Sequence, residues 1–236
     1  MIESHVAENL GEMRTRISVA AAVSGRAENQ VRLVAVSKTK PNEDILAAYN
    51  EGQRHFGENV GVYFNDYEAC TLTLRIHPGT LQSNKCKQIV AIPNLFAVET
   101  VDGTKKADIL QKACIQAQRV EPLNIFVQIN TSGEESKSGI APQECPEVAR
   151  HIAEKCPNLK LSGLMTIGAP NHDPANGPNP DFQILNDCRD SISDVMKGAD
   201  IELSMGMSDD FESAIQMGST NVRLGSCIFG ARGKKV

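Results

Sequence analysis

Short apolar segments rich in β-branched residues recur along the chain, and stretches with the spacing of amphipathic helices separate them. The apolar runs predict strands, because residues of this kind bounded by turn-forming residues are typical of buried β-structure. The expected strands are residues 32–36, 55–57, 74–77, 95–98, 124–130, 161–166, 201–204 and 221–225.

The intervals between these strands carry helix signals. A helix is expected from Pro41, with Glu43 and Asp44 at its positive end and Gly52 closing it. A second is expected over 208–219, which opens with acidic residues and reaches Gly218. Near the start of the chain, Val6, Leu10, Met13 and Ile17 share one helical face, so a helix precedes the first strand.

Strands that alternate with helices imply parallel pairing through right-handed crossovers. Eight such units after one leading helix fit a (β/α)₈ TIM barrel, which usually has about 250 residues. A doubly wound open sheet is the competing architecture. Because nothing in the composition resembles a linker, we expect one domain over residues 1–236, with 168–182 forming a long βα loop at the barrel mouth.

The charge and hydropathy of the chain argue against nucleic acids and membranes as binding partners. The chain has 236 residues, is 41% hydrophobic and has a net charge of −5, with no basic stripe for nucleic acid. No apolar run is long enough to cross a membrane, and the acidic N-terminal segment is unlike a signal peptide. We therefore expect no nucleic acid or membrane partner, and a cytoplasmic location, with the mitochondrion left open.

The number and spacing of the cysteines also favour an intracellular location. Seven cysteines form an odd set with no C-x-x-C pair, which is typical of a reducing compartment and not of a disulfide scaffold or a structural zinc site. No metal site is therefore expected.

In the segment LVAVSKTKP, residues 33–41, Lys38 lies at the end of a predicted apolar strand. A lysine flanked by apolar residues loses hydration, which favours its neutral and nucleophilic form. The alternative is a lysine that extends to solvent. Lys85 and Lys137 are rival nucleophiles, but both lie in polar loop sequence.

Small and hydroxylated residues follow the last two strands. The seventh leads into Ser204, Gly206 and Ser208, and the eighth into Gly225 and Ser226. In a barrel, phosphate commonly binds at these two strand ends, where backbone N–H groups and hydroxyls can reach it. Ordinary helix caps and turns are the alternative. Two adjacent segments favour a phosphate site.

Two further polar residues lie on the predicted strands. Arg223 alternates with apolar neighbours on the eighth strand, so it requires an internal carboxylate or a bound ligand. Asn59 ends the second strand and is either a cofactor donor or a turn residue. A reactive lysine, a phosphate site and an arginine together suit a phosphorylated carbonyl compound, either pyridoxal phosphate or the sugar phosphate of a lysine-dependent aldolase.

These residues also carry a family resemblance, which runs in order from about residue 30 to 232. The chain resembles the pyridoxal phosphate homeostasis proteins, the YggS/PROSC-like family, through LVAVSKTKP, FGEN, LQSNK, VQINTSGEESKSGI, GLMTIG, LSMGMSDDFESAI and GSTNVRLGSCIFGAR. The resemblance implies a fold-type III barrel similar to the barrel domain of alanine racemase, with pyridoxal 5'-phosphate held as an aldimine on Lys38.

The same resemblance implies the remaining cofactor contacts. It sets Arg223 against the pyridine nitrogen and assigns the phosphate to Ser204, Met205, Gly206, Ser208, Gly225 and Ser226. An arginine does not readily give up a proton, so the ring withdraws carbanion charge poorly. The resemblance therefore implies a vitamin B6 cofactor carrier with little or no catalysis and no catalytic residues, which makes transient contact with pyridoxal phosphate-dependent apo-enzymes. We expect the chain to be a monomer.

One segment departs from the family pattern. The family commonly reads W-H-F-I-G before L-Q, whereas this chain reads RIHPGTLQ and has no tryptophan. The wall of the pocket near 75–80 is expected to differ. A second hypothesis is a pyridoxal phosphate-dependent racemase or lyase, for which Cys227, His77 or Tyr63 would be the additional acid or base. An aldolase and a pure scaffold are further alternatives.

Overall fold

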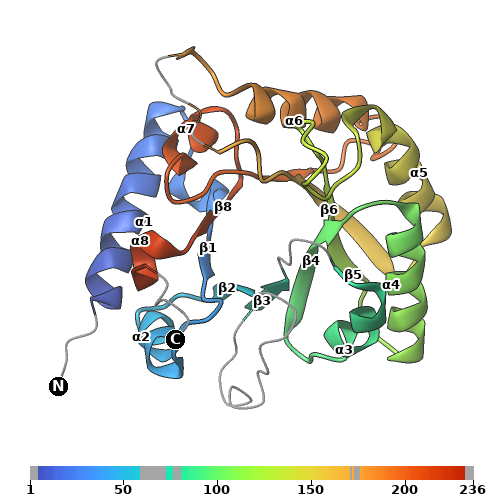
Figure 1. Ribbon diagram of the computed structural model, residues 1–236, viewed down its shortest axis with the longest axis horizontal. Coiled ribbons are helices and arrows are strands. Elements are labelled where there is room, and N and C mark those ends of the chain that lie inside the picture. Colours follow the sequence, from blue (N-terminus) through green and yellow to red (C-terminus); the bar gives the residue numbers. More distant parts are fainter. Residues whose placement is uncertain (1–4, 59–72, 77–80, 171, 173–175, 232–236) are drawn as a thin grey trace.

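The computed structural model describes residues 5–58, 73–76, 81–170, 172 and 176–231 (Figure 1). Strands and helices alternate along the chain. The strands are β1 (Arg32–Val36), β2 (His55–Glu58), β3 (Thr73–Ile76), β4 (Leu95–Val101), β5 (Leu123–Gln128), β6 (Leu159–Met165), β7 (Glu202–Ser204) and β8 (Asn221–Leu224). The helices are α1 (Val6–Val23), α2 (Asn42–Asn50), α3 (Cys86–Val90), α4 (Thr104–Gln116), α5 (Cys145–Lys155), α6 (Pro180–Ser191), α7 (Phe211–Gln216) and α8 (Ser226–Phe229), with 3₁₀ turns at Glu28–Gln30, Ser83–Lys85 and Pro142–Glu144.

The strands pair in chain order, β1 to β8, as a closed parallel barrel. Closure is made by β1, which pairs with β2 on one side and with β8 on the other. In that last pair Val34 lies opposite Arg223 and Ala35 opposite Leu224. The α/β class is confirmed, and an open doubly wound sheet is excluded because its first and last strands would not pair.

Each predicted strand overlaps an observed one, with one large difference in length. The apolar pattern indicated an end at Val98, whereas β4 continues to Val101 and includes the buried Glu99. Pro41 precedes α2 as its N-cap, and Gly52 follows with a φ of 81°. Part of the expected loop 168–182 is helical, because α6 begins at Pro180.

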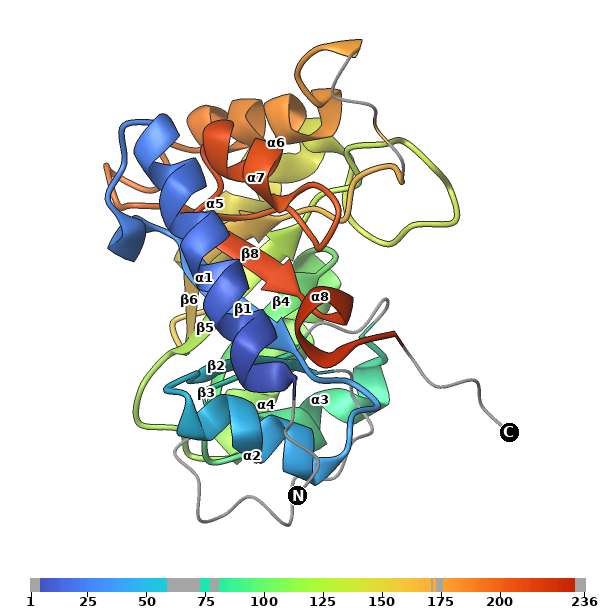
Figure 2. The same cartoon turned by 90° about the vertical axis from the view of Figure 1, so that its left-hand side faces the viewer.

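The apolar core lies mainly between the barrel and the surrounding helices. One cluster joins α1, α2, α7 and α8 to β1, β2 and β8, and a larger one joins α3, α4, α5 and α6 to the other side. The expected face of α1, with Val6, Leu10, Met13 and Ile17, is buried. Figure 2 shows α1 crossing in front of β1 and β8, with α7 and α8 packed beside it, so the leading helix covers the strands that close the barrel.

Apolar residues also fill part of the barrel interior. Ala97, Phe126 and Met165 form a small buried cluster of their own. Gly163 on β6 makes room for it, since a Cβ there would collide with the Phe126 ring and lie 2.5 Å from the carbonyl oxygen of Glu202. No helix within the described part of the chain is both long and apolar enough to span a membrane.

We predict that Gly163→Ala destabilises the protein by about 1–3 kcal/mol, because the added methyl group overpacks a site bounded by backbone. Gly11→Ala is the matched control. Gly11 lies on the exposed face of α1, and a Cβ added there would have nothing within 4 Å, so the change should stabilise by about 0.5–1 kcal/mol. Urea unfolding of both variants measures the difference, and an unchanged midpoint for Gly163→Ala would contradict the packing argument.

Candidate functional site

Lys38 lies immediately beyond the carboxyl end of β1 and is half-buried. The chain turns sharply here, because Thr39 adopts a φ of 67° in the left-handed region. Ser37, just before Lys38, is buried, and its hydroxyl donates to the Glu58 carboxylate at the end of β2. The lysine therefore stands on a backbone segment that is fixed to the neighbouring strand.

Lys40 fixes the same segment to the end of the chain. Its ammonium donates to the carbonyl oxygens of Phe229 at 2.8 Å, Gly230 at 2.7 Å and Ala231 at 3.0 Å. These carbonyls lie at the end of α8, which follows β8. Lys40 therefore holds the β1 end against the β8 end.

Ser208, Gly225 and Ser226 come together at the β8 end of the barrel. The Ser208 hydroxyl oxygen accepts from the backbone N–H of Gly225 at 3.4 Å and from the Ser226 hydroxyl at 3.3 Å. The Cys227 thiol also donates to it, at 3.3 Å. Three donors thus converge on one oxygen atom through long hydrogen bonds, and Ser226 is exposed to solvent. An oxygen of an anion would find the same donors.

The turn between β7 and α7 is shaped by Gly206. Its φ is 95°, and a Cβ would lie 2.6 Å from Ala214 Cβ, so only glycine fits. The next amide, that of Met207, donates to Asp210 Oδ1 at 2.6 Å. Burial raises the pKa of Asp210, while its bond from the Met207 amide and the charge of Arg223 act against that rise.

Arg223 extends from β8 into the barrel interior, where it is 6% exposed. Its Nη1 donates to Ser204 Oγ at 2.8 Å and its Nη2 to the Thr166 carbonyl oxygen at 2.8 Å. The Ser204 hydroxyl in turn donates to Glu99 Oε2 at 2.6 Å. Burial lowers the pKa of Arg223, and the carboxylates of Glu99 and Asp210 oppose that shift.

The sequence-predicted residues therefore divide into three groups. Lys38, Ser208, Gly225 and Ser226 gather at the carboxyl ends of β1 and β8, with Gly206 in the adjoining turn. Arg223 and Ser204 meet inside the barrel, and Met205 is fully buried among the apolar residues outside it. Asn59 lies outside the described residues, as do Tyr63 and His77 and the departing segment at 77–80.

Sequence reasoning missed the partners of Arg223. Glu99 is fully buried and accepts from Ser204 and, at 3.1 Å, from the Asn221 amide. The sequence did contain one signal, because a glutamate follows the apolar run LFAV without a turn residue. An acid inside a strand calls for a buried cation or donors.

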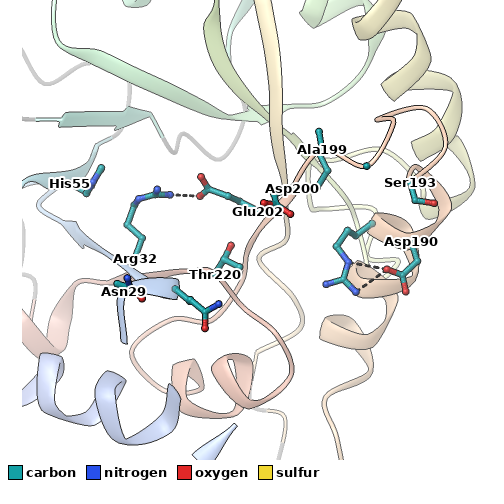
Figure 3. A pocket seen from close by; sticks show the side chains of 13 residues that line it. Asn29, Arg32, His55, Asp190, Ser193, Ala199, Asp200, Glu202 and Thr220 are labelled. Atoms are coloured by element: carbon teal, nitrogen blue, oxygen red, sulfur yellow. Dashed lines mark hydrogen bonds and ion pairs between the residues drawn. The ribbon is translucent and has the colours of Figure 1, made fainter. Parts of the chain in front are cut away.

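A separate cavity of about 800 Å³ lies at the opposite end of the barrel, where the strands begin (Figure 3). Arg32 and Glu202 point toward one another across it and form an ion pair, and Arg189 pairs with Asp190 on its rim. Both arginines are thus neutralised by carboxylates of the same cavity. None of the sequence-predicted site residues lines it.

Replacing Glu99 by glutamine should destabilise the protein by about 3–5 kcal/mol, because it removes the stronger of the two carboxylate interactions, with Glu99 and with Asp210, that offset the buried Arg223 cation. Chemical unfolding measures this loss. Glu12→Gln serves as the control, since Glu12 is exposed and only 3.8 Å from Arg16 on the same helix, and such pairs contribute little. Equal stability of the two variants would show that Glu99 does not balance Arg223.

Comparison with known proteins agrees with this arrangement. The profile of the family described as "Alanine racemase, N-terminal domain" matches residues 9–233. A human protein named pyridoxal phosphate homeostasis protein is 47% identical over 212 residues, covering 86% of this chain and 77% of the human one. Its namesake in Schizosaccharomyces pombe is 43% identical over 219 residues, covering 92% and 90% of the two chains.

A solved structure of PipY from Synechococcus elongatus, described as having pyridoxal phosphate (PLP) bound, superposes with a TM-score of 0.78 at 26% identity, covering 95% of this chain and 100% of PipY. The fold and the sequence identity to these relatives agree over most of the length. The chain belongs to the alanine racemase N-terminal domain family, among the pyridoxal phosphate homeostasis proteins.

Proposed function

We propose that this chain binds pyridoxal 5'-phosphate reversibly and maintains the intracellular pool of this cofactor by holding and releasing it. The observation that carries the proposal is the convergence of Gly225, Ser226 and Cys227 donors on one oxygen position beside the β1 end that bears Lys38. The names of the human and S. pombe relatives, and the cofactor bound to PipY, support it.

The residues present suit each part of this cofactor. Pyridoxal phosphate supplies an aldehyde that condenses reversibly with a primary amine. Lys38 is the amine, while Ser208, Gly225 and Ser226, with the turn at Gly206, hold the phosphate. Met205 packs that turn against the apolar core. Arg223 faces the ring nitrogen, and Asn59 adds a donor to the ring.

Ser204 acts on the cofactor through Arg223. Its hydroxyl is shared between Arg223 and Glu99, so it holds the guanidinium at the barrel wall and links it to a balancing charge. The guanidinium of an arginine stays protonated at the pH values at which proteins are folded. A ring nitrogen that faces it accepts a hydrogen bond and takes no proton, which limits catalysis.

A racemase or lyase is the second candidate, and the surroundings of Cys227 argue against it. Cys227 is the one proposed second acid or base that lies among the described residues. Burial is the main cause that raises its pKa, and its hydrogen bond to Ser208 opposes the rise. The thiol therefore stays protonated near neutral pH and is a poor base.

The proposal also covers the organisation and setting of the chain. We place it in fold type III as one domain over residues 1–236, with α1 as an addition to the barrel, acting as a monomer. Five of the six cysteines within the described ranges are buried, and all six are free thiols, which suits the reducing cytoplasm. Delivery would occur through transient contact with apo-enzymes that need the cofactor.

Lys38→Ala should abolish covalent capture of pyridoxal phosphate, because Lys40, the neighbouring amine, is held by three carbonyl oxygens. The near-visible absorption band of the bound cofactor should disappear, together with the borohydride-fixed label on the peptide that contains residue 38. Lys137→Ala is the control. Its ammonium donates to the Gly168 carbonyl at 2.7 Å and pairs with Glu134, so the band should persist. Retention of the band in Lys38→Ala would overturn the assignment.

Ser208→Ala and Ser226→Ala should each weaken pyridoxal phosphate binding about 10- to 100-fold, the loss expected for one hydrogen bond to a charged group. Unphosphorylated pyridoxal is the internal control, because its affinity does not depend on a phosphate contact. Titration of each variant with pyridoxal phosphate and with pyridoxal distinguishes the loss of a phosphate contact from a general loss of binding. An equal loss for both would show that these hydroxyls do not hold the phosphate.

A further inference from the structure

A group of possible metal ligands lies outside the barrel, where α4 and α5 pack side by side (Figure 1). Asp108 comes from α4, His151 from α5 and Cys156 from the residue that ends α5. His151 Nε2 lies 2.8 Å from Asp108 Oδ1, and Cys156 Sγ lies 3.9 Å from the same oxygen. One ligand atom from each residue falls within 4.8 Å of the others.

These separations are close to those of a zinc site. Bonds of 2.0–2.3 Å in a tetrahedral arrangement place neighbouring ligand atoms about 3.3–3.6 Å apart. The nitrogen and oxygen would separate by roughly half an ångström from their present hydrogen bond. The sulfur would approach the oxygen from 3.9 Å and the nitrogen from a separation of at most 4.8 Å. Rotation of side chains supplies shifts of this size without moving either helix.

The donor set itself selects the class of metal. A thiolate and an imidazole favour Zn²⁺ over Mg²⁺ or Ca²⁺, which prefer oxygen, and one carboxylate completes three protein ligands. Cys156 is only 1% exposed, whereas the side chains of His151 and Asp108 are 28% and 45% exposed. An ion would therefore have the thiol beneath it and an open fourth position that water can occupy.

The backbone around Cys156 is held in place independently of a metal. The Gln111 amide donates to Asn158 Oδ1 at 2.8 Å, and the Asn158 backbone N–H donates to Gln111 Oε1 at 2.9 Å. Gln111 is one turn beyond Asp108 on α4, so this pair fixes the α5–β6 turn against the helix that carries the carboxylate. A fixed turn lowers the cost of ordering three ligands around one ion.

An ordinary His–Asp ion pair between two helices accounts for two of the three residues. The third, Cys156, adds a buried thiol that donates a weak hydrogen bond to the same carboxylate oxygen. The two explanations differ in the role of Cys156, which is needed for metal binding and dispensable for the ion pair.

We propose that Asp108, His151 and Cys156 form a Zn²⁺ site that joins α4 to α5, separate from the cofactor site. Binding forms one bond from the metal to each residue and releases the thiol proton to solvent. The site involves no redox step.

The test is metal titration of the full chain, without a histidine tag and after treatment with a chelator. One equivalent of Zn²⁺ should bind, and the melting temperature should rise by roughly 5–10 °C at a 100-fold excess over Kd. Co²⁺ should bind at the same place and show a sulfur-to-metal charge-transfer band, which reports the thiolate directly.

Two variants and two controls complete the experiment. Cys156→Ser should remove the charge-transfer band, and His151→Ala should weaken binding about 100-fold or more. Cys114→Ser changes another buried thiol on this side of the barrel and should keep both signals. Lys38→Ala should also keep them, so failure of the cofactor proposal would leave this result intact. Absence of Zn²⁺ binding in the wild-type chain, or undiminished Co²⁺ absorption in Cys156→Ser, would overturn the proposal.

Discussion

The burial of the Arg223 charge inside the barrel is the constraint on which the site depends. A guanidinium that is 6% exposed is costly unless its charge and its donors are satisfied. Ser204 and Thr166 accept its hydrogen bonds, and Glu99 supplies the opposite charge through Ser204. These groups come from β4, β7, β8 and the end of β6, so the charge is stable only in a closed barrel.

The alternation of strands and helices could be predicted from local sequence, because each buried strand is a short apolar run bounded by turn residues. The face of α1 and the turn at Gly52 follow from the same kind of local rule. The end of β4 could not be predicted in this way. Its last residues include Glu99, which is buried only because residues more than 100 positions later approach it.

In the candidate site too, some residues could be predicted from the sequence, whereas others depend on contacts between distant parts of the chain. Lys38 and the serines after β7 and β8, Ser208 and Ser226, were found because strand ends in a barrel share one edge. Arg223 was found because it alternates with apolar neighbours on its strand. Ser204 looked like part of the phosphate segment, whereas its side chain points inward to Arg223. The Asp108, His151 and Cys156 group was not found from the sequence, since Asp108 lies 43 residues before His151. Only the packing of α4 on α5 brings them together.

The pairing of β1 with β8 has a consequence for how the protein is made. Lys38 leaves the ribosome well before Ser208, Arg223 and Ser226, which lie far later in the sequence. The carbonyls that Lys40 holds, at Phe229, Gly230 and Ala231, come later still. A nascent chain therefore has the reactive amine long before it has the groups that retain a phosphate, so ligand capture requires that the chain has been made through α8 and that β8 has paired with β1.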